Sequence, residues 1–165
     1  MIVMGYPGVG KSTLARFYHD NDYIDLETSN FDRRPEWYYD YCNVAEDLSR
    51  QGFIVLTGCH KEIRDRLMRL SMEELCLIYP SIDLKEAWIE RLSDRAIKNG
   101  CVEKDLRALE RVKEKWIEDH RELEDFINKN IDYCSAIIVN EDIFSSKYYI
   151  DIINGGIQHI KRMGE

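Results

Sequence analysis

A glycine-rich loop near the start of the chain limits the possible folds more than any other feature. Residues 5–12 read Gly-Tyr-Pro-Gly-Val-Gly-Lys-Ser and match the pattern G-x-x-x-x-G-K-[ST] at every fixed position. The pattern is informative when it lies between a strand and a helix. A short apolar run, residues 1–4, precedes the loop, and residues 13–18 have the composition of a helix. We therefore predict a strand–loop–helix unit at the start of the chain.

This loop also predicts a binding site for phosphate groups. Its glycines let the backbone curl so that successive N–H groups point inward, and the following helix adds the positive end of its dipole. Lys11 can reach the terminal phosphates, and the hydroxyl of Ser12 is placed to bind Mg²⁺. We expect ATP and Mg²⁺ to bind to the loop and the first helical turn, through Gly5, Gly8, Val9, Gly10, Lys11, Ser12 and Thr13.

Beyond the loop, strands and helices alternate along the chain. Apolar runs predict four more strands, at residues 23–27, 53–57, 75–79 and 136–139. Helical patterns predict five more helices, at residues 36–50, 61–70, 83–97 (capped by Asp83), 103–128 and 147–162. Such alternation implies a three-layer α/β/α sandwich around a five-stranded parallel sheet. The carboxyl ends of the strands would then gather the chemistry along one edge.

Composition narrows the cellular setting and the partners. The 165 residues fit one domain, and no apolar run approaches the roughly 20 residues of a membrane span. The five cysteines are widely spaced without a C-x-x-C pair, which argues against disulfides or zinc and favours a reducing cytoplasm. Because the loop begins at residue 5, we expect no cleaved leader. The net charge of −8 disfavours nucleic acid as the main partner without excluding it.

Absent motifs separate the classes of protein that share this loop. GTPases carry D-x-x-G after a strand, and this tetrapeptide occurs nowhere in the chain. The guanine-reading N-K-x-D is also missing, since Asn128-Lys129-Asn130 is followed by Ile131. Motor ATPases end a long apolar strand with an acidic residue, but neither the third nor the fourth predicted strand does so. The carboxylates lie instead on the second strand, at Asp25 and Glu27.

With these features the sequence resembles the small phosphotransferases of the nucleoside monophosphate kinase superfamily, above all its shikimate-kinase-like and gluconate-kinase-like branches. In these enzymes the second strand ends in an acidic motif, often D-x-D, whereas "YIDLE" offers D-x-E. The stretch "FIVLTGCHKEIRDRL" is similar to a gluconate-kinase segment, and "LKEAWIERLSDR" is similar to the helix that enters the mobile lid. The resemblance implies one P-loop kinase domain, residues 1–165, with an acceptor-binding segment near 28–50 and a helical lid near 95–128.

Two carboxylates are candidates for work on the metal and the acceptor. Asp25 stands at the carboxyl end of its strand, beside Ser12, where it could hold Mg²⁺ through a water or orient the acceptor oxygen. Glu27 is two residues further on and shares its face of the strand, so we expect it to serve the acceptor. The alternative is that Glu27 caps a turn with Thr28 and Ser29.

The segment after the second strand supplies candidate acceptor contacts. Arg33 and Arg34 could fork onto an acceptor phosphate, or belong to a solvated turn. Trp37 and Tyr41 share a helix face, where they could stack on a base or belong to the core. His60 follows the third strand and could bond an acceptor hydroxyl or phosphate, or cap the next helix.

The predicted lid supplies positive charge. Arg91 and Arg95 lie four residues apart on the helix that enters it, and Arg107 and Arg111 repeat this spacing on the next helix. Arginines that close over the transferring group would exclude water and suppress ATP hydrolysis. We expect Arg91 and Arg95 to join Lys11 and Asp25 in catalysis, against the alternative of solvated ion pairs such as Glu103–Arg107.

The expected activity is transfer of the γ-phosphoryl group of ATP to a nucleoside or deoxynucleoside monophosphate. A hydroxyl of a small metabolite, like shikimate or gluconate, is the enzymatic alternative, and a base or nucleotide within a nucleic acid is a variant. A regulatory module that binds a nucleotide without transfer is the alternative from another class.

Overall fold

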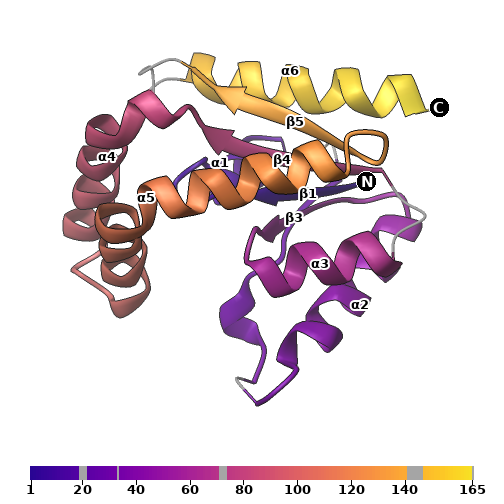
Figure 1. The fold of residues 1–165 in the computed structure, drawn as a ribbon, viewed down its shortest axis with the longest axis horizontal. Helices are drawn as coiled ribbons and strands as arrows, with labels where there is room; N and C mark the ends of the chain where they lie inside the picture. The colour runs from indigo at the N-terminus through magenta and orange to yellow at the C-terminus, as the bar shows by residue number, and fades with distance from the viewer. Residues whose placement is uncertain (19–21, 33, 71–73, 141–146, 165) are drawn as a thin grey trace.

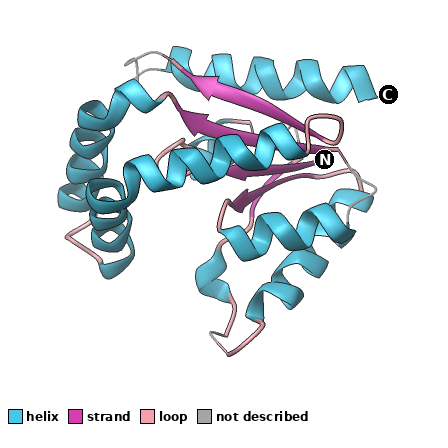
Figure 2. Ribbon diagram, viewed as in Figure 1, coloured by secondary structure: helices cyan, strands magenta, loops and turns pink. Residues whose placement is uncertain are grey.

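The computed structural model describes residues 1–18, 22–32, 34–70, 74–140 and 147–164 (Figures 1 and 2). Its strands are β1 Ile2–Gly5, β2 Tyr23–Asp25, β3 Ile54–Gly58, β4 Leu75–Pro80 and β5 Cys134–Val139. Its helices are α1 Lys11–Phe17, α2 Trp37–Arg50, α3 Lys61–Leu70, α4 Lys85–Lys98, α5 Glu103–Lys129 and α6 Lys147–Gly164. Two short 3₁₀ turns, η2 Thr28–Asn30 and η3 Ile82–Leu84, complete the described elements.

The five strands form one parallel sheet in the order β2-β3-β1-β4-β5. In Figure 1, α5 and α3 lie in front of the sheet and α1 lies behind it. Helix α6 contacts α1 and the edge strand β5. The predicted three-layer α/β/α fold with a five-stranded parallel sheet is therefore confirmed.

The core lies on both sides of the three central strands. The apolar residues of β1, β3 and β4 are buried throughout, because helices cover both faces of the sheet. Helices α4 and α5 follow one another and pack together as a helical hairpin. Two fully buried tryptophans, Trp88 of α4 and Trp116 of α5, join this hairpin to the core. His120 of α5 is also buried, and its ring nitrogens lie 2.7 Å from the carbonyl oxygen of Trp116 and 2.9 Å from that of Pro80.

Several boundaries differ from those predicted. Helix α1 begins at Lys11, because Gly10 adopts a left-handed conformation (φ 88°) that starts the helix directly after the loop. Strand β2 ends at Asp25, so Glu27 lies beyond the strand at the start of the η2 turn, and the argument that placed both acids on one strand face is wrong. Asp83 lies within η3 and does not cap α4, whose first flanking residue is Leu84.

The helices that cover the sheet are amphipathic, with one buried face and one exposed face. In the longest, α5, buried Val112, Trp116 and Leu123 alternate with exposed charged residues, as expected for a helix that packs along one side. Within the described parts of the chain, no helix combines the length and the apolar character needed to cross a bilayer.

Candidate active site

A cavity of about 1790 Å³ opens among the glycine-rich loop at residues 5–12, the ends of β2 and β3, and the α4–α5 hairpin. We call this loop the phosphate loop, after the sequence pattern that it matches. Its lining includes residues 5–8 and 10–13 of the loop and first helix, together with residues 25–29 at the end of β2 and the start of η2. Pockets for one small ligand usually measure roughly 300–1,000 Å³. The cavity therefore has room for a nucleotide and a second small molecule together.

The loop has the backbone conformation that its glycines predicted. Gly8 and Gly10 have φ values of 93° and 88°, a region that other residues rarely adopt. Lys11 donates from Nζ to the carbonyl oxygen of Gly5 at 2.9 Å, and Ser12 is exposed at the cavity. Burial lowers the pKa of Lys11, although the nearby Cys59 and Asp25 oppose that effect.

Donors from α4 and α6 occupy three successive carbonyl oxygens of the loop. Trp88 donates from Nε1 to Pro7 at 2.6 Å, and Arg91 donates from Nε to Gly8 at 2.7 Å. Tyr149 donates from its hydroxyl to Val9 at 3.3 Å. Because backbone carbonyl groups that are wholly or partly buried need hydrogen-bond partners, these three bonds stabilise the path of the loop.

Gly8 offers a prediction about this support. A Cβ at position 8 would lie 2.9 Å from Nε1 of Trp88, and at Gly52, which also has a positive φ, it would meet nothing within 4 Å. Gly52→Ala should therefore cost only the backbone strain of about 1–2 kcal/mol. Gly8→Ala should lower the melting temperature further and weaken Mg-ATP binding about tenfold or more, measured by thermal unfolding and calorimetry. Equal effects of the two variants would contradict the role of the Trp88 contact.

Both predicted carboxylates line the cavity. Asp25, the last residue of β2, pairs in register with Leu56 of β3. Glu27 forms an ion pair with Lys104, at the start of α5, across the cavity from β2. Ser29 donates weakly to the same carboxylate at 3.5 Å, so Glu27 interacts with its turn and also faces the cavity.

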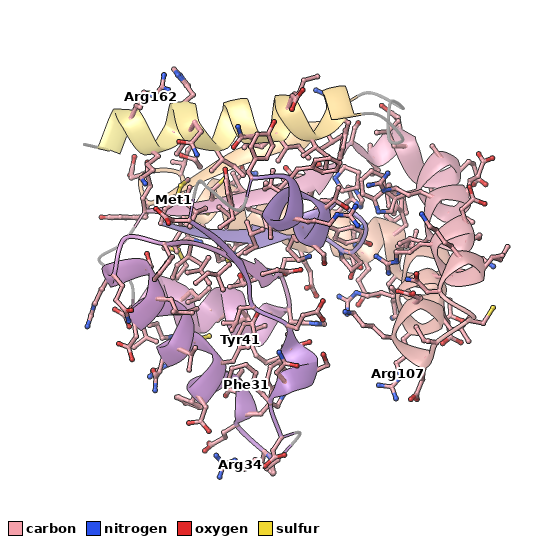
Figure 3. The ribbon with its side chains drawn as sticks, turned by 180° about the vertical axis from the view of Figure 1, so that it is seen from behind. Met1, Phe31, Arg34, Tyr41, Arg107 and Arg162 are labelled. Atoms are coloured by element: carbon pink, nitrogen blue, oxygen red, sulfur yellow. The ribbon has the colours of Figure 1, made fainter. Side chains whose placement is uncertain are left out.

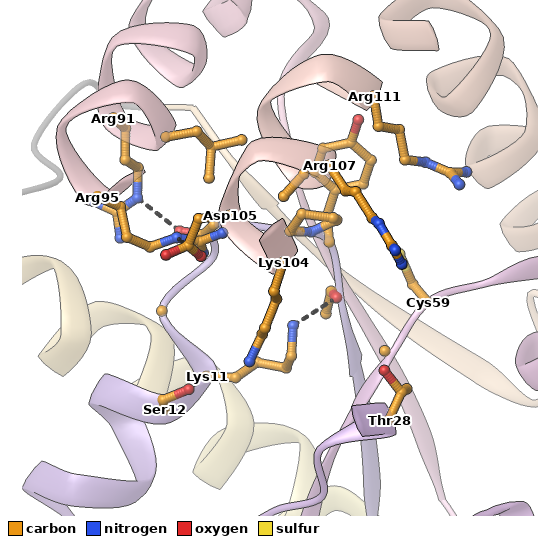
Figure 4. Close-up of a pocket in the computed structure, with 18 of the residues that line it drawn as sticks. Lys11, Ser12, Thr28, Cys59, Arg91, Arg95, Lys104, Asp105, Arg107 and Arg111 are labelled. Carbon is orange, nitrogen blue, oxygen red and sulfur yellow. Dashed lines mark hydrogen bonds and ion pairs between the residues drawn. The ribbon is translucent and has the colours of Figure 1, made fainter. Parts of the chain in front are cut away.

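Four arginines of the hairpin line the cavity, as the lid prediction requires. Figure 4 shows Arg91 and Arg95 on one side of Lys11, and Arg107 and Arg111 on the other side. Each also has a protein partner: Arg95 binds Asp105 at 2.9 Å, and Arg107 forms the predicted ion pair with Glu103. Arg91 lies with its guanidinium carbon 5.7 Å from the ring centre of Trp88, and burial lowers the pKa of Arg91. The predicted ion pairs are thus present, and the same guanidinium groups still line the cavity.

The predicted acceptor residues are only partly brought together. His60 lines the cavity, but the described residues Arg34, Trp37 and Tyr41 do not, and Arg33 lies outside the described residues. Figure 3 shows Arg34 far from the sheet, where it pairs with Asp40 at 2.5 Å with both side chains exposed. The shared face of Trp37 and Tyr41 is confirmed, since their rings meet edge to face at 5.7 Å.

Tyr41 supports the site from behind. Its side chain is fully buried, so the interpretation of this residue as a base-stacking platform does not fit. Its hydroxyl donates to the carbonyl oxygen of Leu26 at 2.7 Å and accepts from the N–H of Gly58 at 3.1 Å. Burial raises the pKa of Tyr41 above its ordinary value, so the hydroxyl keeps its proton. Tyr41 therefore ties together the ends of β2 and β3, beside Asp25 and His60 of the cavity lining.

Further residues line the cavity, and of these Tyr6, Lys104 and Asp119 were not predicted from the sequence. Lys104 and Asp119 line the cavity from α5, and Tyr6 lines it from a variable position of the loop motif. Arg64 of α3 is buried beside Cys59, and its Nη1 donates a hydrogen bond to the carbonyl oxygen of Cys59 at 2.7 Å. Since the partners of Tyr6 and Lys104 lie far away in the sequence, no local spacing could have indicated them.

Mg²⁺ fits the site only together with a nucleotide. Within the described part of the chain, no group of three or more His, Cys, Asp or Glu could hold a metal unaided. Magnesium in such sites is usually bound by one or two protein groups, substrate phosphates and waters. Ser12 and Asp25, which both line the cavity, supply a hydroxyl and a carboxylate of the required kind.

Comparison with known proteins adds no family to this description. A scan against protein-family models found no match for the chain, and a search of curated proteins found none either. Functional conclusions therefore rest on the residues and geometry of the cavity.

Proposed function

We propose that the protein is an ATP- and Mg²⁺-dependent phosphotransferase. The observation that carries the proposal is one cavity lined by Lys11 and Ser12 of the phosphate loop, Asp25 of β2, and arginines of the hairpin. Phosphoryl transfer needs mainly alignment of the two substrates and neutralisation of charge. The cavity supplies groups for both.

Each group has a role that follows from its chemistry. Amides of the loop and Lys11 bind the donor phosphates, and Ser12 with Asp25 would hold Mg²⁺. The metal neutralises charge on the phosphates when it is bound. Asp25, aided by Glu27, orients the acceptor oxygen, which bonds to the γ-phosphorus as the bond to the β-phosphate oxygen breaks and ADP leaves. Arg91 and Arg95 complete the neutralisation and keep water out.

A nucleoside or deoxynucleoside monophosphate is the first candidate for the acceptor. The acceptor side contains the buried Arg64 as a cation, together with the apolar side chains of Phe31 and Leu26. A cation and apolar surface suit a phosphate and a base. The second candidate is a hydroxyl of a small polar metabolite, which the absence of Arg34, Trp37 and Tyr41 from the described lining favours.

A coupled assay of ADP release tests the proposal. The protein is incubated with Mg-ATP and, in turn, each ribo- and deoxyribonucleoside monophosphate, shikimate, gluconate and a short oligonucleotide. Turnover above the hydrolysis background with a monophosphate supports the first candidate, and turnover with shikimate or gluconate alone supports the second. ATP binding without transfer to any of them would overturn the proposal in favour of a regulatory module.

We also propose a cytoplasmic setting, because all five cysteines are free thiols. Burial raises the pKa of Cys42 and of Cys134 to about 12, so these thiols stay protonated and behave as core residues.

A further inference from the structure

Asp119 of α5 is the point where the phosphate loop meets the helical hairpin. Tyr6, in the loop, donates from its hydroxyl to Oδ2 of Asp119 at 3.0 Å. Arg111, two turns before Asp119 on α5, donates from Nε to Oδ2 at 2.8 Å and from Nη2 to Oδ1 at 2.7 Å. The carboxylate thus accepts three hydrogen bonds and links two separate segments of the site.

The link joins a buried anchor to a cavity side chain. Asp119 and Tyr6 are buried, whereas the side chain of Arg111 is 42% exposed and lines the cavity. A two-point bond to a carboxylate fixes the plane of a guanidinium group as well as its position. Arg107, one turn earlier, has only an exposed partner, Glu103, and is itself 69% exposed. Of these two arginines of α5, Arg111 is the one with a rigid support.

Arg111 lines the same cavity as Lys11. Its partner Asp119 accepts from Tyr6, which directly follows Gly5, the residue whose carbonyl oxygen accepts from Nζ of Lys11. In agreement with this arrangement, the positive charges of Lys11, Arg64 and Arg111 all oppose the rise that burial causes in the pKa of the Cys59 thiol. The lysine of such a loop reaches the β- and γ-phosphates. Figure 4 shows Arg111 on one side of Lys11 and Arg91 and Arg95 on the other side, so arginines flank the lysine of the loop.

We propose that Asp119 is a positioning residue that holds Arg111 against the terminal phosphoryl group of ATP and, through Tyr6, ties this arginine to the phosphate loop. The inference rests on the proposed binding of ATP, although not on transfer. Since ADP lacks the group that Arg111 would contact, the link should help the protein to distinguish ATP from ADP.

Calorimetry with Mg²⁺ and two probes, ADP and the unreactive β,γ-imido analogue of ATP, tests this inference. Asp119→Asn and Arg111→Lys should each weaken binding of the analogue by about 10- to 100-fold and change ADP binding by less than about threefold. Tyr6→Phe should act in the same direction with a smaller effect. The double variant Arg111→Lys/Asp119→Asn should bind the analogue as tightly as whichever single variant has the lower affinity. The reason is that both changes disrupt the same Arg111–Asp119 ion pair, so their effects should not add.

Matched controls come from the same helix. Asp125→Asn and Arg121→Lys change exposed residues of α5 that lie outside the cavity lining, and both should bind like the unmodified protein. Equal losses for ADP and the analogue, or losses that multiply in the double variant, would overturn the inference in favour of a purely structural role. If Asp119→Asn fails to fold, the Tyr6→Phe and Arg111→Lys arms still decide. Absence of transfer in the unmodified protein would remove the proposed activity without affecting this comparison.

Discussion

Lys11→Ala is expected to lower phosphoryl transfer by about 10²- to 10³-fold or more. Lys11 is the cation of the phosphate loop, it is half-buried, and its Nζ donates to the carbonyl oxygen of Gly5. Removing it leaves the developing charge on the phosphates without its nearest ammonium group. The steady-state rate with saturating Mg-ATP and the best acceptor measures the loss.

Two controls make this result specific. Lys61→Ala removes an exposed lysine of α3 outside the cavity lining and should leave the rate unchanged. Lys11→Ala itself should keep its circular dichroism spectrum and melting temperature close to those of the unmodified protein, because the remaining loop contacts come from α4 and α6. A folded Lys11→Ala variant with nearly full activity would exclude the loop from the reaction.

Asp25→Asn is expected to lower kcat by about 10²- to 10⁴-fold, the usual range for a group that assists proton transfer or orients an acceptor. The affinity for Mg-ATP should change far less, since the loop amides and Lys11 provide most of the contacts with the donor. Asparagine keeps the shape of the side chain, so the sheet edge at β2 stays intact. Rapid-mixing measurements of transfer, combined with ATP titration, separate the two effects.

Asp47→Asn is the matched control, because Asp47 is an exposed acid on α2 that does not line the cavity. It should leave both kcat and ATP affinity unchanged. An Asp25→Asn variant that loses ATP affinity in proportion to its activity would assign Asp25 to donor binding alone. An unchanged rate would remove Asp25 from the mechanism.

The fold could be predicted because its signals are local. Continuous apolar runs marked β3 and β4, since strands covered on both faces lack alternation. The loop pattern alone placed Lys11 and Ser12 after the carboxyl end of the first strand, and this prediction needed no other part of the chain. The ends of elements were harder: Thr28 and Ser29 indicated a turn, but nothing in the apolar run 23–27 showed that the strand ends at Asp25, before Glu27.

The rest of the site depends on packing between distant segments. Tyr6 and Asp119 are 113 residues apart, and Lys104 meets Glu27 across 77 residues. Helical spacing correctly put Trp37 and Tyr41 on one face, but it could not tell whether that face covers the core or a ligand. The complete burial of the Tyr41 side chain shows that this residue belongs to the core, and Phe31, with its ring centre 5.1 Å from that of Tyr41, lies between it and the cavity.

The central claim is that the loop binds a nucleoside triphosphate, and calorimetric titration of Mg-ATP into the folded protein tests it most directly. The account predicts a saturable heat of binding at about one site per chain, strongly reduced in Lys11→Ala and unchanged in Lys61→Ala. A correctly folded protein that releases or absorbs no heat, at concentrations where millimolar affinity would be seen, would contradict it.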